Sequence, residues 1–172
     1  MKSSAILVGV LKSAGEISDT TLFPAAVEDC HWIEVRADLL PELDPAELRE
    51  GCKGRQLLYT LRNSKEEQRG RISLAQRHQL LRKAAGSYDF VTLEGEFDLV
   101  PELLRAIAPE RRIVSWRGRA TGSECLEAQL GAFTRTPARL FRFEVECEGV
   151  EDGLAALQFL HRVHRHQAVG PT

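Results

Sequence analysis

The sequence predicts an α/β fold in which parallel strands curl toward a (β/α) barrel of the TIM type. Six short apolar segments recur about every 25 to 30 residues, and segments with helical periodicity separate them. This alternation is typical of a parallel sheet with helices outside it. The absence of a glycine-rich phosphate loop disfavours a nucleotide-binding doubly wound sheet and favours a barrel. A complete barrel has eight units and typically about 250 residues, so six units in 172 residues predict an incomplete one.

The predicted strands are short runs rich in β-branched, aromatic and other apolar residues. They cover residues 5–11, 31–36, 56–61, 88–93, 112–116 and 140–145. Apolar residues at helical spacing predict helices in the stretches between them, in segments 45–48, 74–84, 99–107 and 154–160. Asp44 and Ser73 are suited to cap the first two helices, and Pro101 is tolerated in the first turn of the third.

Polar side chains gather at the end of three successive predicted strands. Glu34 and Arg36 alternate on the second strand and therefore point to the same side of the sheet. In parallel α/β folds the carboxyl edge of the sheet is where binding and catalytic groups gather. A pair of this kind on one strand can be surface charge, but three strands with the same chemistry indicate a site. The residues concerned are Glu34, Arg36, Asp38, Thr60, Arg62, Glu66 and Glu94.

Composition excludes several classes of protein. A formal net charge of −2 gives no electrostatic footprint for nucleic acid or a membrane surface, and no apolar run approaches the roughly 20 residues of a membrane span. The four cysteines form no close pair. Three histidines crowd the last predicted helix without a carboxylate or cysteine at ligand spacing, so we assign them no metal. We therefore expect one cytoplasmic domain over residues 1–172, with neither metal nor cofactor.

The strand motifs resemble those of type I 3-dehydroquinate dehydratase. Residues 33–40 read Ile-Glu-Val-Arg-Ala-Asp-Leu-Leu and residues 58–62 read Leu-Tyr-Thr-Leu-Arg, similar to the second and third strands of that family. Residues 88–94, 113–116 and 140–143 resemble its fourth, fifth and sixth strands. The resemblance spans nearly the whole chain in order and spacing. It implies a (β/α)8 barrel and a step of the shikimate pathway.

The resemblance also implies roles for individual residues. In the family, a sixth-strand lysine forms an imine with the substrate ketone, a fifth-strand histidine moves the protons and a glutamate orients that histidine. Glu66 matches the glutamate, although the loop reads Glu66-Glu67-Gln68 where the family has Glu-Gly-Gly. The family's substrate-binding set is matched by Glu34, Arg36 and Arg62.

Two catalytic positions differ from the family. Arg117 stands where the family has its histidine, and Arg142 stands where it has the lysine. Arginine stays protonated at neutral pH, so it supplies neither the free amine that an imine needs nor a neutral base. No lysine follows Lys83, and Lys12 after the first predicted strand is the only conceivable substitute.

Three hypotheses follow. The first is a dehydroquinate dehydratase-like domain without dehydratase activity, which serves as a structural, dimerising or ligand-binding module. The second is a barrel enzyme or binding module whose arginine-lined pocket takes a small anionic ligand, a carboxylate or phosphate such as 3-dehydroquinate. The third is part of a longer active enzyme. Because the seventh and eighth units are not found, we also expect a second copy or a fused or partner domain, such as another shikimate-pathway activity, to cover the open barrel edge.

Overall fold

The computed structural model describes residues 6–13, 28–63, 72–120 and 122–168, and its core is one curled parallel sheet. The six strands are hydrogen-bonded in sequence order, and every neighbouring pair is parallel. Their bounds are β1 Val8–Leu11, β2 Trp32–Arg36, β3 Gln56–Thr60, β4 Phe90–Glu94, β5 Arg112–Gly118 and β6 Leu140–Val145. The predicted incomplete barrel is confirmed as a half-barrel in which β1 and β6 are the edges.

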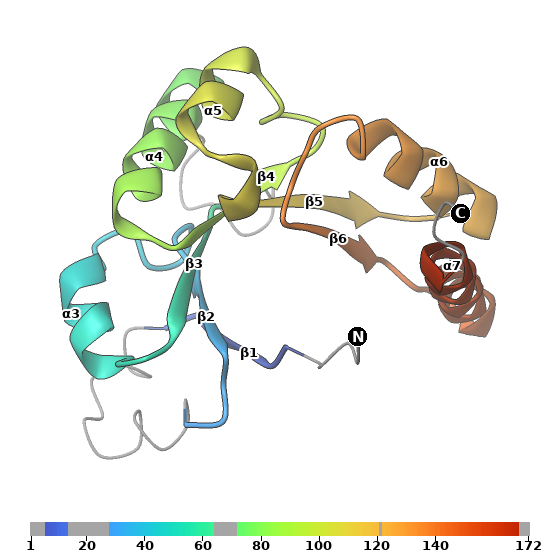
Figure 1. Ribbon diagram of the computed structural model, residues 1–172, viewed down its shortest axis with the longest axis horizontal. Coiled ribbons are helices and arrows are strands. Elements are labelled where there is room, and N and C mark those ends of the chain that lie inside the picture. Colours follow the sequence, from blue (N-terminus) through green and yellow to red (C-terminus); the bar gives the residue numbers. More distant parts are fainter. Residues whose placement is uncertain (1–5, 14–27, 64–71, 121, 169–172) are drawn as a thin grey trace.

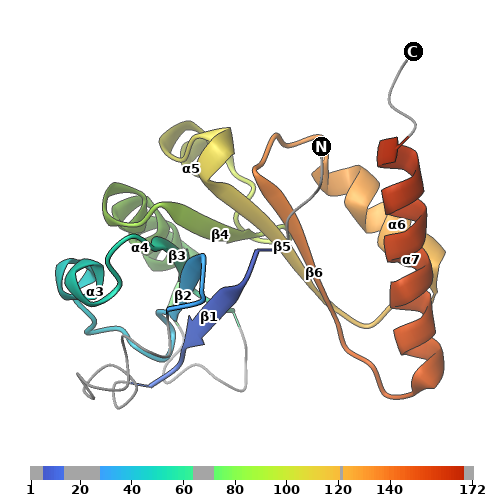
Figure 2. The same cartoon turned by 60° about the horizontal axis from the view of Figure 1, so that its bottom comes forward.

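The helices lie on the outer, convex side of the sheet (Figures 1 and 2). Their bounds are α3 Pro45–Gly51, α4 Leu74–Ser87, α5 Pro101–Ala106, α6 Ser123–Phe133 and α7 Val150–Ala168, with a 3-10 turn, η1, at Pro109–Arg111. The first three cover the β2 to β4 half, whereas α6 and α7 cover β5 and β6 (Figure 1). Among the described helices, none has the length and hydropathy of a bilayer span.

The predicted roles of Asp44, Ser73 and Pro101 at helix starts are confirmed, whereas α7 begins at Val150, four residues before the predicted segment. The Asp44 carboxylate accepts a hydrogen bond from the Ala46 N–H at 2.8 Å. The Ser73 hydroxyl accepts one from the Gln76 N–H at 3.2 Å, while the Gln76 side chain accepts one from the Ser73 N–H. Pro101 is in the first turn of α5. These contacts satisfy N–H groups that a helix leaves unpaired at its start.

Helix α6 is the element that the sequence analysis overlooked. It buries Leu126 and Phe133 against the outer face of β5 and β6, and Leu130 packs beside them. The spacing of these three residues is that of one helix face. The helix begins after Gly122, whose φ of +132° is a conformation that favours glycine. The helical spacing of the apolar residues was present in the sequence, but no capping side chain marks the start of the helix.

The core has an outer part between sheet and helices and a smaller inner part on the concave side. The outer part includes Ile33, Leu57, Val91 and Leu103, all completely buried. On the concave side four apolar side chains fill the base of the half-barrel: Trp32, Leu58, Phe90 and Ile113. Above this base the inward-facing positions are polar. We call the four apolar residues the apolar floor of the half-barrel and the polar end above them its polar mouth.

A buried ion pair joins α4 to the loop after β4. Arg77 lies in the apolar face of α4 and is 1% exposed, and its Nε and Nη2 donate to the two Asp98 oxygens at 2.8 and 2.6 Å. Asp98, which is completely buried, also accepts the Glu94 N–H at 2.8 Å. The pair therefore holds the end of β4 as well as the helix.

We expect Asp98→Ala to lower the free energy of unfolding by about 3–5 kcal/mol, because it leaves the Arg77 guanidinium buried without its principal partner. Urea denaturation followed by circular dichroism measures the loss. The control is Glu102→Ala, which removes the exposed partner of Arg105 and is expected to cost less than about 1 kcal/mol. Equal losses in the two variants would contradict this account of the buried pair.

Candidate functional site

A pocket of about 390 Å³ opens at the carboxyl edge of the sheet, on the concave side. Residues from four strands and the loops that follow them line it, with Thr60, Thr92 and Ser115 among the hydroxyl-bearing side chains. The Thr60 and Thr92 hydroxyls are 2.7 Å apart and hydrogen-bonded. The charged lining residues are Arg62, Glu94, Glu96, Arg117, Arg142, Glu144 and Glu146.

The alternation of the strands explains why these residues meet. Ile113 belongs to the apolar floor, so Ser115 and Arg117 on the same strand also face the concave side. In the register of β5 and β6, Ser115 is opposite Arg142 and Arg117 is opposite Glu144. Strands β2 to β5 therefore each contribute an apolar residue near the start and polar residues near the end.

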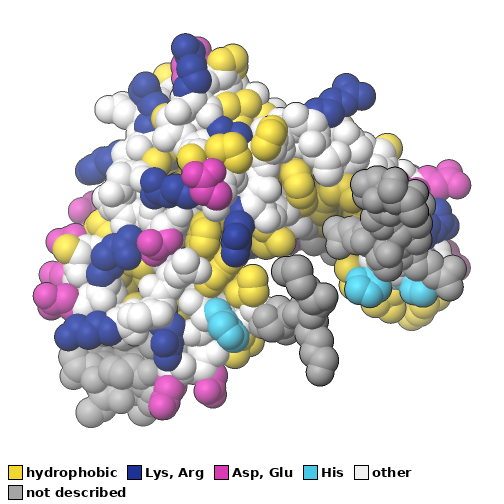
Figure 3. Space-filling view, in the orientation of Figure 1, with side chains coloured by type: hydrophobic (Ala, Val, Ile, Leu, Met, Phe, Trp, Pro, Cys, Tyr) yellow, Lys and Arg dark blue, Asp and Glu magenta, His cyan; other side chains and the backbone are white. Residues whose placement is uncertain are grey.

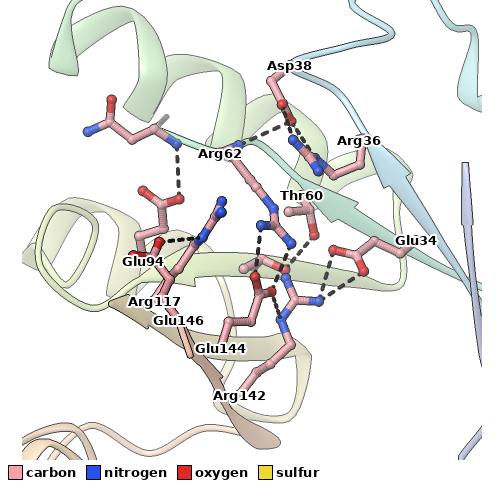
Figure 4. Close-up of polar contacts among 12 residues, drawn as sticks. Glu34, Arg36, Asp38, Thr60, Arg62, Glu94, Arg117, Arg142, Glu144 and Glu146 are labelled. Carbon is pink, nitrogen blue, oxygen red and sulfur yellow. Dashed lines mark hydrogen bonds and ion pairs between the residues drawn. The ribbon is translucent and has the colours of Figure 1, made fainter. Parts of the chain in front are cut away.

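Arg142 reaches across the concave side from β6 to β2. Its Nη1 donates to both Glu34 oxygens at 2.9 Å, and its Nε lies 3.2 Å from a Glu144 oxygen (Figure 4). The Glu34 side chain is only 5% exposed, and that of Arg142 is 22% exposed. Charged groups this well shielded from water need a partner of opposite charge. The Glu34 carboxylate and the Arg142 guanidinium are partners of each other.

The same carboxylate of Glu144 also binds Arg62. Arg62 donates from Nη2 to Glu144 Oε1 at 2.9 Å, and its Nη1 lies 2.8 Å from Oε2. This two-point geometry is the strong form of an arginine–carboxylate pair. Glu34, Arg142, Glu144 and Arg62 thus form a chain of alternating charge from β2 through β6 to the end of β3 (Figure 4).

The remaining two arginines of the site differ in burial. The Arg36 side chain is 4% exposed and donates from Nε and Nη2 to Asp38 at 3.0 and 2.6 Å. Arg117 is 47% exposed, and its Nε lies 3.2 Å from Glu146. The sequence analysis placed Arg117 at a proton-transfer position, and in the structure it lies at the rim of the pocket, half in solvent.

Glu94 ends β4 beside the Arg77–Asp98 pair. Its Oε1 accepts the Asn63 N–H at 3.0 Å, and its Oε2 lies 3.3 Å from Arg77 Nη2. Burial raises the pKa of the Glu94 carboxyl above its ordinary value, while Arg77 and the Asn63 N–H act in the opposite direction. The Glu94 carboxyl is therefore easier to protonate than an ordinary exposed glutamate.

Of the predicted site residues, Arg62, Arg117 and Arg142 line the pocket. Glu34 contacts this set through Arg142, and Arg36 is paired with Asp38 and does not line the pocket. Glu66 lies in residues 64–71, outside the described part of the chain. The sequence analysis did not identify Arg77 and Asp98, which hold Glu94 in place. Arg77 stands in the apolar stripe of its helix, which signals a buried partner without saying which carboxylate provides it. Within the described ranges, no three side chains that commonly bind metals gather as a cation site.

The raised pKa of Glu94 predicts a pH dependence of stability. Between its ordinary value of 4.5 and the raised value, the folded state binds more protons than the unfolded state, so this group's contribution to the free energy of unfolding falls as pH rises. Glu94→Gln stays neutral and keeps an oxygen for the Asn63 N–H. We expect wild type to lose stability relative to this variant as pH rises above 4.5, measured by urea denaturation at several pH values. A difference that is constant with pH would contradict the assignment.

Comparison with known proteins places the chain in a family. The type I 3-dehydroquinase family model matches residues 13–172, whereas no protein of curated function has a matching sequence. A 3-dehydroquinate dehydratase from Geobacillus kaustophilus HTA426 is similar in structure, with a TM-score of 0.77 and 17% identity over 95% of this chain and 70% of its own. A type I enzyme from Clostridium difficile, solved with covalent modified comenic acid, has a TM-score of 0.73 and 19% identity over 90% and 68%. One from Enterococcus faecalis has a TM-score of 0.76 and 17% identity over 96% and 76%. The chain belongs to the type I 3-dehydroquinase family.

Proposed function

We propose that this chain is a dehydroquinase-like domain of the shikimate pathway that lacks dehydratase activity. The observation that carries the proposal is the position of Arg142 on β6, inside the half-barrel and bonded to Glu34. The imine chemistry that the family resemblance implies needs an amine at this position, and a guanidinium cannot supply one because it stays protonated near neutral pH.

The described lysines offer no evident replacement. Lys53 follows α3, and Lys83 lies exposed on α4, on the outer side of the sheet. Lys12 follows β1 at the carboxyl edge, where its side chain is exposed. Lys2 and Lys65 fall outside the described residues. Lys12 is therefore the described lysine that an activity test has to exclude.

The pairing of the arginines favours a module without this chemistry over a pocket for a small anion. Arg142, Arg62 and Arg117 each contact a carboxylate of the chain itself: Glu34, Glu144 or Glu146. An anionic ligand would have to displace a carboxylate that is already bound, and it would leave that carboxylate without a partner in a shielded site. The arginines of the pocket are thus neutralised by carboxylates of the chain itself, which argues against a site for an anionic ligand.

The test measures dehydration of 3-dehydroquinate together with imine trapping by borohydride, read as a covalent mass increase of the intact chain. We expect wild type to show neither turnover nor trapped adduct. Turnover by wild type, or an adduct on a wild-type lysine, would sink the proposal. Lys12→Met then shows whether Lys12 is the amine concerned.

The restored variant Arg117→His, Arg142→Lys shows whether the pocket still accepts the substrate. We expect a borohydride-dependent adduct on the new lysine at position 142 that increases as pH rises, because the neighbouring Glu34 favours the charged amine and only the neutral amine forms an imine. The control is Arg139→Lys, which places an exposed lysine directly before β6, at the end of the strand opposite the pocket. Calorimetric titration with 3-dehydroquinate then separates a wild-type pocket that binds without turnover from one that does not bind.

A further inference from the structure

The pocket at the carboxyl edge holds a shielded hydroxyl group that has no partner in the described part of the chain. Ser115 is 8% exposed, lines the pocket and faces the concave side, opposite Arg142 in the register of β5 and β6. The Thr60 and Thr92 hydroxyls in the same pocket are bonded to each other, whereas no described residue bonds to the Ser115 hydroxyl. Polar groups this well shielded need a hydrogen-bond partner. The Ser115 hydroxyl therefore indicates that the pocket receives a polar molecule.

The arginines of the pocket already contact carboxylates of the chain, which limits the charge that this molecule can carry. Arg62 and Arg142 share Glu144, with nitrogen–oxygen distances of 2.8 and 3.2 Å. The Arg117 Nε lies 3.2 Å from Glu146. A carboxylate or phosphate of a ligand would have to compete with these contacts. The arrangement therefore disfavours an anion.

Carboxylates outnumber guanidiniums in the pocket. Four glutamates and three arginines line it, which gives the described lining a formal charge of −1, and Glu34, which contacts Arg142, makes this −2. Glu96 is exposed and makes neither a hydrogen bond nor an ion pair within the described residues. Over α3 and α4, by contrast, acidic and basic side chains are interspersed on the face in view (Figure 3). The pocket is thus a place of surplus negative charge.

Glu94, at the end of β4, gains from an added positive charge. Burial raises the pKa of its carboxyl above the ordinary value, because a shielded environment opposes the charged form. A cation in the pocket acts in the opposite direction and favours the carboxylate. Figure 4 shows Glu94 and the Arg117–Glu146 pair on one side of the site and Glu34 on the other. The side with Glu94 and Glu146 is therefore the one that suits a cation.

The size and lining of the pocket fit an organic cation better than a metal ion. Its volume of about 390 Å³ lies in the range of small-molecule sites, roughly 300–1,000 Å³. Phe97 lines it and is 38% exposed, and an aromatic ring attracts an ammonium group placed over its face. Across the described ranges, no group of three metal-binding side chains gathers. The pocket is therefore suited to an ammonium group on a carbon skeleton.

From these observations we propose that the pocket binds a small organic cation, an amine that also carries a hydroxyl or another hydrogen-bonding group. The ammonium lies among Glu94, Glu96 and Glu146, and the hydrogen-bonding group pairs with the Ser115 hydroxyl. The inference rests on the proposed function, because a working dehydratase would need the same pocket for 3-dehydroquinate, which is an anion. It makes the domain a ligand-binding module rather than a purely structural one.

NMR titration of the nitrogen-15-labelled chain tests the proposal with three probes of one three-carbon skeleton. Protonated 1,3-diamino-2-propanol carries two ammonium groups, glycerol carries no charge and tartronate carries two carboxylates. In an amine-free buffer of low ionic strength, which limits screening, we expect the diamine alone to give saturable shifts of the Gly95 and Arg117 amide signals. Tartronate that binds as tightly as the diamine, or a diamine without saturable shifts, would overturn the proposal.

Variants check which groups hold the diamine. Ser115→Ala is expected to weaken its binding about fivefold, as one lost hydrogen bond does. Glu96→Gln removes a pocket carboxylate without breaking a contact among the described residues, and we expect a loss of about threefold. The matched control is Glu102→Gln on α5, whose exposed carboxylate lies outside the pocket and whose loss should leave binding as in wild type. Circular dichroism verifies that all three variants are folded.

The dehydratase assay keeps this inference and the proposed function apart. Turnover of 3-dehydroquinate by wild type would overturn the proposed function and the cation site with it. Absence of turnover combined with absence of diamine binding would overturn the cation site alone. So would diamine binding that Ser115→Ala and Glu96→Gln weaken no more than Glu102→Gln does.

Discussion

The ion pair between Arg142 and Glu34 is the interaction on which the concave side of the half-barrel depends. It joins two residues 108 positions apart and connects β6 with β2, which are not neighbours in the sheet. Backbone hydrogen bonds hold each strand only to the next one. The curvature of the sheet brings these two strands face to face, and the guanidinium spans the space between them. With Glu34 almost completely buried, loss of Arg142 would leave a carboxylate without compensation in a poorly solvated site.

The apolar floor and the polar mouth of the half-barrel contribute to the fold in different ways. Trp32 and Phe90 pack at a ring-centroid distance of 4.3 Å in the floor, and burial of such rings is the larger contribution to stability. The ion pairs above contribute less net free energy, because desolvation offsets most of their attraction. Their effect is on specificity. Arg62 and Arg142 meet Glu144 only when β3 and β6 are correctly placed, so a shifted register would bury unpaired charge.

Sequence reasoning found the strands because burial on both faces leaves a short continuous apolar run, as in Leu57 to Tyr59. It also placed Arg62, Arg117 and Arg142 at the carboxyl edge, where all three line the pocket, since strand ends in a parallel sheet share that edge. It did not find that Glu34 pairs with Arg142 across the concave side. Glu34 and Arg36 lie on the same side of one strand, yet Glu34 bonds to Arg142 and Arg36 to Asp38. Pairing across the concave side depends on sheet curvature, which no local pattern encodes. The buried Asp98 was overlooked for the same reason, because its partner comes from another element.

On the proposed function, Arg142 occupies the position of the family's imine-forming lysine, and an arginine there has a physical logic of its own. A lysine at position 142 would present one point charge between Glu34 and Glu144, and it would have to lose a proton there before it could react. Two flanking carboxylates favour its charged form and oppose that loss. Arginine has no such conflict, because its separate nitrogens reach both carboxylates and it never needs to be neutral. The two carboxylates would thus hinder the deprotonation that a catalytic amine needs, but they stabilise a guanidinium. With a permanent cation at position 142, Glu34 and Glu144 are paired without substrate, which is what the proposed module without dehydratase activity requires.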